Sequence, residues 1–558
     1  MTERSTTATA AIDHPVVRED SRLTPELAQQ YVDTGGWESI TLCSMLTAAA
    51  KEFPNRVAAV DQSVGGQTTE KLTYAQLADR SSRFAFGLHD LGVRAGDSVA
   101  VMLPNCIDFA ALIFAINQLG AIYTGIPVGY GKLEVEVILR RTGAGVIVAV
   151  ESFGSSSPIS LVRKLRPSLP SLRHVVVSGP SPLAEGERTL TSLLEASPVD
   201  LPDVDPRALC HVGFTSGTTG EPKGVMNTHQ TLYAVLRNWV AHVRLETLGE
   251  PFVNLVASPI GHHTGFLWGV LLTTYLRGTA IYLDRWNPDR AADIVREEGV
   301  TTLFGAPTFL QDLLLTNLAY DSRCTLRTVI LAGSPVPRTL PAVAGAAFGC
   351  YVCPAWGMTE LGIGISCASY LPDSIQTTDG VVVPGSEMRV VGLDGKKAPL
   401  AGATGLLEIR GPGLFLGYLQ RPDATAEAIN ADGWFNTGDT ARLTPEGYVI
   451  LEGRTKDIVI RGGENIPVVV VESLLFQHPQ ILEASVVGLP DPRFGERACA
   501  VVVPSGDIVP TLEELCMYLL EQGLSKHFLP ERLEVVSSLP KTPSGKIRKA
   551  ELRNLYTP

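Results

Sequence analysis

Short apolar segments of the strand type alternate with helical patterns over most of the chain, and this alternation limits the possible folds more than any other feature. Helices are expected over residues 42–53 and 74–91, the second capped by Thr73. Strands are expected over residues 57–61, 98–103, 146–150, 174–177, 301–305, 327–332 and 350–354. Because strands separated by helices of this length form parallel sheets covered on both faces, the predicted fold class is α/β with parallel sheets.

The pattern changes after about residue 380, where the expected strands are linked by glycine and aspartate turns. Strands over residues 381–391, 404–410 and 448–452 predict a smaller β-rich subdomain at about 381–455. A compact pattern of its own follows, with strands over residues 458–460, 484–489 and 497–504 and a helix over 511–523. We therefore expect a leader, partly disordered, at residues 1–38, a large N-terminal domain at 39–455 and a small α+β C-terminal domain at 456–558.

The bulk properties exclude some classes of protein. At 558 residues the chain is too long for one hydrophobic core. A net charge of −12 argues against a nucleic-acid-binding protein but leaves room for a local polyanion site. The most apolar run, residues 109–127, is broken by polar residues and predicts a buried helix followed by a strand rather than a membrane span. Since the N-terminus lacks the apolar core of a signal peptide, we expect a cytoplasmic protein.

Nine cysteines are scattered through the sequence, and Cys350 and Cys353 have the C-x-x-C spacing found in some metal sites. A second pair or a nearby histidine, which would complete such a site, is missing from the sequence around them. We therefore expect both cysteines to be small buried residues of a strand.

Residues 215–224 (TSGTTGEPKG) combine three glycines with several hydroxyl residues and one lysine. Glycine admits backbone angles that let successive N–H groups converge on phosphate oxygens, while hydroxyls add donors and Lys223 adds positive charge. The pattern G-x-x-x-x-G-K-[ST] of common nucleotide triphosphatases is absent. By composition alone, the segment is either a phosphate-binding loop or a flexible surface loop.

The residues around this loop indicate how it is held. The apolar run over residues 209–214 predicts a strand that enters the loop. A helical spacing follows the loop, with Asn227 or Thr228 as the candidate N-cap and apolar positions at Leu232, Val235, Leu236 and Trp239. Ligands of parallel sheets gather at the carboxyl ends of strands, which is where the loop is expected.

Five further segments contain residues suited to catalysis, although each also has an ordinary structural explanation. His262 and His263 lie in a glycine-flanked apolar stretch, and they are either residues of a pocket wall or structural histidines. Glu360 follows a predicted strand and turn, and it is either a Mg²⁺ ligand or a solvated residue at the start of a helix. Asp439 ends the segment WFNTGD, and it either accepts hydrogen bonds from ribose hydroxyls or is part of a β-turn.

The last two segments, residues 453–457 and 540–547, carry charges that alone would indicate a charged linker and a basic tail. Together the segments resemble the adenylate-forming enzymes, a superfamily that includes acyl-CoA synthetases, nonribosomal adenylation domains and firefly-type luciferases. The resemblance covers about residues 40–553 and rests on five motifs in the family's order: TSGTTGEPKG, WGMTE, WFNTGD, GRTKDIVIRGGENI and PKTPSGKIRK.

The resemblance implies a role for each motif residue. The β- and γ-phosphates of ATP would be wrapped by Thr215, Ser216, Gly217, Thr218, Thr219, Gly220 and Lys223. Adenine would be flanked by Gly333, Ser334, Pro335, Ala355, Trp356, Gly357 and Met358. Thr359 would lie near the α-phosphate, Glu360 would bind Mg²⁺, and Asp439 would hold the ribose with Arg454 beside it. The catalytic lysine would be Lys546, which reaches the substrate carboxylate and the α-phosphate.

In such enzymes the C-terminal domain is mobile and rotates between two half-reactions, here about Lys456 as the hinge residue. The rotation would withdraw Lys546 and bring the CoA-binding face around Gly462, Gly463 and Glu464 to the active site. The two glycines would let a pantetheine arm pass close to the backbone.

The choice of acid follows from the same resemblance. An aspartate that binds the substrate ammonium in amino-acid-activating members is replaced by His263, which disfavours an α-amino acid. The segment SPIGHHTGF resembles the branch that activates alicyclic, aromatic or medium-chain acids, such as cyclohexanecarboxylate–CoA ligases. There His262 would close the acyl pocket or move when CoA arrives, while Gly305 and Gly357 would leave room for a ring or chain.

The sequence leaves the acceptor open. CoA is the first choice, because no carrier domain follows Lys546 in the sequence; a free acyl carrier protein and an amine are the alternatives. A catalytically inactive sensor of ATP or acyl-adenylate is disfavoured by the joint presence of Lys546, Glu360, Asp439 and Arg454. A serine hydrolase is disfavoured because the G-x-S-x-G motif is absent. The expected partners are the acid, ATP and CoA, without nucleic acid, and the chain would act as a monomer or homodimer.

Overall fold

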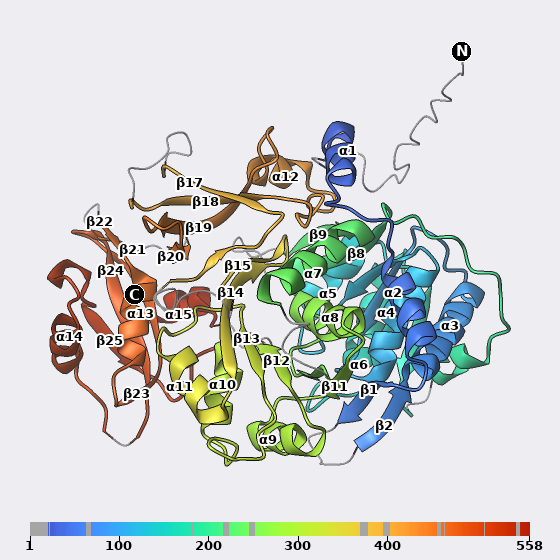
Figure 1. Ribbon diagram of the computed structural model, residues 1–558, viewed down its shortest axis with the longest axis horizontal. Coiled ribbons are helices and arrows are strands. Elements are labelled where there is room, and N and C mark those ends of the chain that lie inside the picture. Colours follow the sequence, from blue (N-terminus) through green and yellow to red (C-terminus); the bar gives the residue numbers. More distant parts are fainter. Residues whose placement is uncertain are drawn as a thin grey trace.

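The computed structural model describes residues 21, 23–62, 68–180, 183–215, 222–244, 251–368, 378–393, 402–454, 459–461, 464–506, 508–542 and 547–557. Two large sheets, one layer of helices between them and two smaller sheets make up this part of the chain (Figure 1). The predicted α/β fold with parallel sheets is confirmed. Among the described residues, no helix has both the length and the apolar character needed to cross a membrane.

The first large sheet has seven strands among the described residues, in the order β7-β6-β5-β3-β4-β8-β9. Its neighbours are parallel except for β8 and β9, which form an antiparallel hairpin. The strands are β3 (Ser98–Met102), β4 (Ile122–Gly125), β5 (Val146–Val150), β6 (His174–Ser178), β7 (Glu187–Thr189), β8 (Leu209–Thr215) and β9 (Lys223–Thr228).

The second large sheet has nine strands in the described residues, in the order β16-β15-β14-β13-β12-β10-β11-β1-β2. Its central strands are parallel, and β2, β15 and β16 are antiparallel to their neighbours. The strands are β1 (Val57–Gln62), β2 (Thr68–Thr73), β10 (Val253–Val256), β11 (Thr279–Leu283), β12 (Thr302–Gly305), β13 (Thr328–Leu331), β14 (Tyr351–Met358), β15 (Gly362–Ser366) and β16 (Val381–Val382).

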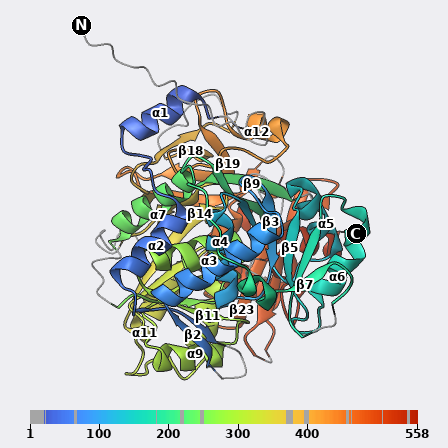
Figure 2. The ribbon, with the colours of Figure 1, turned by 90° about the vertical axis from the view of Figure 1, so that its right-hand side faces the viewer.

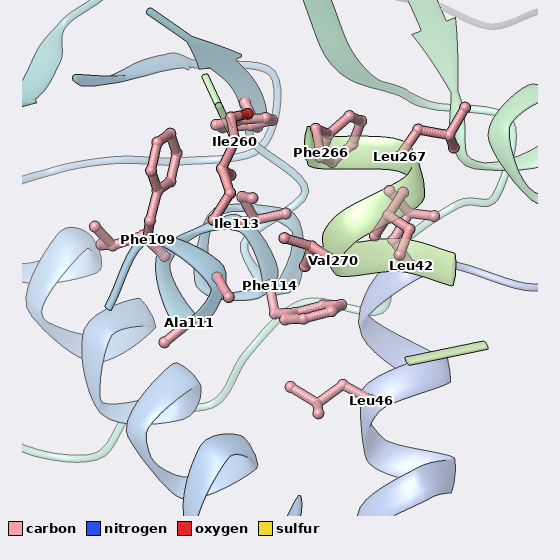
Figure 3. Packing of buried hydrophobic residues seen from close by; sticks show 14 of the residues in the cluster. Leu42, Leu46, Phe109, Ala111, Ile113, Phe114, Ile260, Phe266, Leu267 and Val270 are labelled. Carbon is pink, nitrogen blue, oxygen red and sulfur yellow. The ribbon is translucent and has the colours of Figure 1, made fainter. Parts of the chain in front are cut away.

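One layer of helices packs against both large sheets. It contains α2 (Leu42–Glu52), α3 (Tyr74–Asp90), α4 (Ile107–Gln118), α7 (His229–Val243), α8 (Leu272–Tyr275) and the π-helix η4 (Gly265–Leu271). Helix α4 is buried on every side, and Figure 3 shows its side chains meeting those of α2 and η4. This burial explains why residues 109–127 are so apolar: as predicted, the run is a buried helix followed by a strand.

The outer face of each large sheet has its own helices. Those on the seven-stranded sheet are α5 (Lys132–Thr142) and α6 (Pro158–Leu165), and those on the nine-stranded sheet are α9 (Pro288–Glu297), α10 (Pro307–Leu314) and α11 (Leu340–Phe348). Parallel strands are thus covered on both faces, as their apolar sequences require. Short 3₁₀ turns complete this part: η1 (Arg166–Ser168) and η2 (Thr191–Glu195).

Two smaller sheets follow in the chain. The four-stranded sheet β17-β18-β19-β20 consists of β17 (Glu387–Val391), β18 (Gly405–Arg410), β19 (Phe435–Leu443) and β20 (Val449–Arg454), with α12 (Pro422–Ala428) beside it. Helix α1 (Pro25–Asp33) lies near α12 in both ribbon views, and the indole of Trp37, which follows it, donates a 2.8 Å bond to the Pro412 carbonyl (Figures 1 and 2).

The last sheet joins β22, β21, β24 and β23, with β25 paired to β24. Its strands are β21 (Val459–Arg461), β22 (Glu464–Ile466), β23 (Ile481–Asp491), β24 (Gly495–Pro504) and β25 (Arg532–Val535). Its helices are α13 (Val468–Phe476), α14 (Leu512–Glu521), η6 (Lys526–Phe528) and α15 (Lys549–Tyr556). The division of the chain into residues 1–38, 39–455 and 456–558 stays a prediction.

Most predicted elements are present within a few residues, and their caps are the predicted ones. Thr73 caps α3 and Thr228 caps α7, each through a capping box. The expected strand over residues 381–391 is wrong, because Pro384 and Gly385 form a turn that divides it. Its first part, β16, completes the nine-stranded sheet, and its second part, β17, starts the four-stranded sheet. Strand β9 was not expected.

A half-buried carboxyl group links β1 to the start of α4. Asp61 accepts a 2.7 Å bond from the backbone N–H of Ile107, at a helix start where the N-cap Cys106 makes no side-chain capping bond. Burial raises the pKa of Asp61 to about 7, and the nearby carboxylates of Asp108 and Glu70 add to this effect, while the Ile107 bond and Arg80 oppose it. Folding therefore favours the protonated form of Asp61 near neutral pH.

This environment predicts that Asp61→Asn stabilises the protein at alkaline pH. The pKa of Asp61 in the folded chain lies above the ordinary value, so its stabilising contribution is present at low pH and lost as pH rises toward 7 and beyond. Asparagine keeps the acceptor for Ile107 without the charge. At pH 8 the melting temperature of Asp61→Asn should exceed that of the wild type by about 3 °C, and the difference should shrink toward pH 5.

Differential scanning fluorimetry between pH 5 and pH 8.5 measures this difference. Asp61→Ala is the matched control, because it removes the acceptor as well as the charge and should lower the melting temperature at every pH. If the melting temperatures of the wild type and of Asp61→Asn changed with pH by the same amount, the raised pKa of Asp61 would be contradicted.

Candidate active site

The predicted phosphate loop closes the β8–β9 hairpin. Thr215 is the last residue of β8 and pairs with Lys223, the first residue of β9. The loop thus connects two strands, and α7 begins only after β9. Lys223 lies with its ammonium 4.8 Å from the centre of the Tyr418 ring. The predicted loop residues Ser216, Gly217, Thr218, Thr219 and Gly220 lie outside the described residues.

Glu360 occupies the turn after β14 and is buried, with 6% of its surface exposed. The Tyr418 hydroxyl donates a 2.9 Å hydrogen bond to its Oε1, and the backbone N–H of Phe415 donates to its carbonyl. Burial raises the pKa of the Glu360 carboxyl, whereas the bond from Tyr418 and the charges of Arg454 and Lys223 act in the opposite direction. A carboxylate, a phenol and a lysine therefore form one connected group beside the hairpin.

Asp439 is held by donors from two different sheets. It lies on β19 opposite Arg454 of β20, whose Nε donates to Asp439 Oδ1 at 3.2 Å. The indole N–H of Trp356, on β14, donates to the other carboxylate oxygen at 2.9 Å. The structure thus joins the predicted ribose residues to the predicted adenine segment, whose residues Ala355, Trp356, Gly357 and Met358 all belong to β14.

Thr359 lies against the strand that leads into the phosphate loop. A Cβ built on Gly213 of β8 would be 3.1 Å from the Thr359 methyl carbon, so backbone and side chain are in close contact there. Since Thr359 and Glu360 are consecutive, the end of β14 and the end of β8 meet at one place. This is the position that the sequence predicts for the α-phosphate.

Three of the glycines predicted around the site are required by the local structure for different reasons. Gly333, after β13, has φ +90°, a backbone angle that favours glycine; Ser334 and Pro335 follow it. A Cβ on Gly357 would overlap with the Gly362 carbonyl oxygen, and one on Gly305 would lie 2.6 Å from the Phe309 ring. The space freed at Gly357 and Gly305 is thus partly occupied by the protein itself, while their place in the acyl pocket stays a prediction.

The two adjacent histidines have unlike surroundings. His262 is half-buried and its Nδ1 lies 3.2 Å from the Thr264 hydroxyl, whereas His263 is buried with 8% exposure. Burial lowers the pKa of His263 to about 3, and the neighbouring His262 adds to this effect. His263 is therefore neutral at physiological pH. Both residues stay predicted members of the acyl pocket.

Sequence reasoning missed three residues that organise this region. Tyr418, which binds Glu360, has no signal in the local sequence. Asn105, after β3, donates to the carbonyls of Val256, Ser258 and Leu283 and accepts from Ile260 N–H, which fixes the segment leading to His262. His211, on β8, stacks on Phe266. A lone histidine in the apolar run 209–214 is a usable signal for His211.

The predicted residues of the C-terminal part are described only in part. Lys456, Gly462, Gly463 and Lys546 lie outside the described residues, and of Glu464 only the backbone, at the start of β22, is described. The segment that contains Lys546 is bounded by a β-bridge between Lys541 and Ile547, and Lys541 forms a 2.8 Å ion pair with Glu483. Roles for these residues remain predictions.

Comparison with known proteins decides the family. The family model described as AMP-binding enzyme matches residues 46–419, and the one described as AMP-binding enzyme C-terminal domain matches residues 470–546. The chain belongs to the AMP-binding enzyme family. This confirms the resemblance found in the sequence and, with it, the predicted enzyme class.

Individual relatives of this AMP-binding enzyme align over nearly its whole length. The medium-chain fatty-acid–CoA ligase of Escherichia coli (strain K12) is 32% identical over 534 residues, which cover 94% of this chain and 92% of that protein. A feruloyl-CoA synthase of an Amycolatopsis species is 34% identical over 495 residues, which cover 87% and 94%. ATP-bound MatB from Rhodopseudomonas palustris superposes with a TM-score of 0.81 at 27% identity, covering 93% of this chain and 99% of that one.

The bond from Tyr418 predicts a shift in the pH dependence of activity. Tyr418→Phe keeps the ring beside Lys223 but removes the donor that favours ionised Glu360, so the pKa of Glu360 should rise further. As the pH is lowered, activity that needs ionised Glu360 should then be lost at a higher pH in the variant than in the wild type. At pH 7, kcat/KM for ATP should fall about tenfold.

Pyrophosphate release measured between pH 5 and pH 9 tests this shift. Tyr320→Phe is the matched control, because Tyr320 is 78% exposed and its substitution should leave the profile unchanged. If the activity of Tyr418→Phe and of the wild type fell at the same acidic pH, the bond from Tyr418 would not act on the carboxylate that activity requires.

Proposed function

We propose that the protein joins a carboxylic acid to CoA in two steps driven by ATP. The carboxylate oxygen attacks the α-phosphorus of ATP, which gives acyl-AMP and releases pyrophosphate. The sulfur of CoA then attacks the acyl carbon, and AMP leaves as the acyl-CoA thioester forms. The observation that carries the proposal is the convergence of Glu360, Asp439 and Arg454 on the end of β14, beside the β8–β9 hairpin.

Asp439 is suited to hold the ribose. A carboxylate accepts several hydrogen bonds, so its oxygens can receive ribose hydroxyls as well as the bonds from Trp356 and Arg454. These two donors fix the orientation of the carboxylate before the nucleotide arrives. The adenine would then lie along residues 355–358 and 333–335, as the family motif implies.

The phosphates would lie between the hairpin loop and Glu360. Mg²⁺ commonly binds one or two carboxylates and takes its remaining ligands from phosphates and water. Glu360 fits such a site: it is a buried carboxyl group whose raised pKa is opposed by the bond from Tyr418 and by the charges of Arg454 and Lys223, and a bound cation would favour its ionised form further. The ion would neutralise phosphate charge; Glu360 would hold it, and Lys223 would contact the β- and γ-phosphates.

Lys546 is the proposed catalytic residue of the first step. Attack of a carboxylate on a phosphate brings two anions together, so a positive charge between them lowers the barrier. The thiol step would follow a rotation of the C-terminal domain about Lys456, which brings Gly462, Gly463 and Glu464 to the site. Membership of the family supports this sequence of events.

The proposed acid is alicyclic, aromatic or of medium chain length. A neutral His263 cannot replace an aspartate as a partner for a substrate ammonium, which disfavours α-amino acids. CoA is the preferred acceptor, and two relatives of the chain, a medium-chain fatty-acid–CoA ligase and a feruloyl-CoA synthase, support it. A carrier protein or an amine is the alternative. Because cytoplasmic pools supply ATP and CoA, we place the reaction in the cytoplasm.

A panel of carboxylic acids tests the reaction. We expect pyrophosphate release that depends on at least one alicyclic, aromatic or medium-chain acid, and a matching acyl-CoA detected by mass spectrometry when CoA is present. Pyrophosphate release without acyl-CoA from any acid would point to a carrier protein or an amine as the acceptor. Absence of acid-dependent turnover would favour the sensor.

Two variants should separate the half-reactions. Lys546→Ala should slow acyl-AMP formation about 10²–10³-fold but leave thioester formation from supplied acyl-AMP nearly unchanged. Lys456→Pro should do the reverse, because it stiffens the proposed hinge. Single-turnover measurements of each half-reaction give both rates. If either variant slowed both half-reactions equally, its assigned role would be wrong.

A further inference from the structure

His211 is a buried imidazole in the middle of an apolar strand, with 2% of its surface exposed. Its ring stacks on Phe266 of η4, with the ring centres 4.3 Å apart, and on Tyr123 of β4, at 5.4 Å. Tyr123 is also its cross-strand partner. Tyr123 and Phe266 are themselves 5.1 Å apart, so the three rings form one compact buried cluster that fixes the position of the imidazole.

His263 lies next to this stack, with its ring centre 5.5 Å from that of His211. The Nδ1 atoms of both histidines are buried, and no described group forms a hydrogen bond with either. Burial also lowers the pKa of His211 well below its ordinary value, so both rings are neutral. Two polar nitrogens thus lie unpartnered in an apolar region, which is unfavourable unless a ligand or water satisfies them.

The position of the pair relates it to the reaction centre. His211 and Gly213 lie on one face of β8, because they are two residues apart. A Cβ on Gly213 would be 2.8 Å from the His211 ring and 3.1 Å from the Thr359 methyl carbon. His211 therefore lies just beyond Thr359, and His263 continues from it toward His262. Because Thr359 is predicted to lie near the α-phosphate, the two histidines lie close to the predicted site of the acid.

A hydroxyl group matches this pair. A neutral imidazole has one N–H and one acceptor nitrogen, and a hydroxyl can donate to one ring and accept from the other. Phe266 and Tyr123 are buried against His211, so the surroundings of the pair are aromatic, and such surroundings suit a planar substrate ring. A site built to bind a hydroxyl rejects an acid without one, since the buried nitrogens would then remain unpaired.

We propose that His211 and His263 form the polar end of the acyl site and select an aromatic acid that carries a ring hydroxyl. The proposal rests on the proposed acid activation. His211 and His263 act as specificity-determining residues, and they take no part in bond making at the phosphorus.

Matched acids test the proposal on the full-length enzyme. Pyrophosphate release is measured with benzoate and with 2-, 3- and 4-hydroxybenzoate, at saturating ATP and CoA. The wild type should have a kcat/KM at least about 100-fold higher for one hydroxybenzoate than for benzoate. In His211→Phe, which keeps a ring in the cluster, and in His263→Leu, this ratio should fall below about tenfold, mainly because kcat/KM for the preferred hydroxybenzoate falls.

The ratio of two acids within one variant does not depend on how much of the enzyme folds. His263→Asn, which keeps a hydrogen-bonding group, should retain part of the preference. His242→Phe is the matched control, because His242 is a buried histidine that contacts the Ser366 carbonyl, and its substitution should leave the ratio unchanged.

The outcomes separate the two proposals. If the wild type turns over other acids but uses every hydroxybenzoate no better than benzoate, the inference is overturned, water would occupy the pair, and the proposed function stands. An unchanged ratio in both His211→Phe and His263→Leu also overturns it. If no acid of any class supports pyrophosphate release, the proposed function itself fails.

Discussion

The candidate active site depends on a single layer of helices that two large sheets share. Parallel strands must be covered on both faces, and here one buried core contacts β3, β4, β5 and β6 on one side and β1, β10, β11, β12 and β13 on the other. Helix α4 lies inside this core, with its side chains against α2 and η4 (Figure 3). Because both sheets are fixed to the same layer, the end of β8 and the end of β14 are held together, and Gly213 contacts Thr359 at their junction.

The acidic residues at this junction are stabilised by specific donors. Asp439 receives bonds from Trp356 and Arg454, which come from different sheets, and Glu360 receives the Tyr418 hydroxyl. Burial raises the pKa of a carboxyl group, as it does at Asp61 and at Glu360, and the bond from Tyr418 opposes this effect at Glu360. The donors thus orient both side chains and favour their ionised forms, which is what the proposed nucleotide and cation sites require.

Local patterns in the sequence predicted the helices and strands well, whereas they could not predict contacts between distant segments. The spacing of apolar residues located the parallel strands, and Thr73 and Thr228 cap the predicted helices. Strand β9 was missed because Lys223–Thr228 is short and follows a glycine-rich loop. The motifs placed Glu360, Asp439 and Arg454 through the family resemblance. Tyr418 and Asn105 could not be found in this way, because their importance lies in partners far away in the chain.

Asn105 carries a consequence for how this enzyme can change its substrate. Its one side-chain amide ties the loop after β3, in the seven-stranded sheet, to the ends of β10 and β11 in the nine-stranded sheet and to the segment before His262. That segment cannot shift outward without breaking bonds in both sheets at once. If this segment lines the proposed acyl pocket, evolution toward a bulkier or smaller acid would exchange individual side chains on a fixed frame, because remodelling the loop would disrupt the scaffold. Specificity can diverge here one residue at a time.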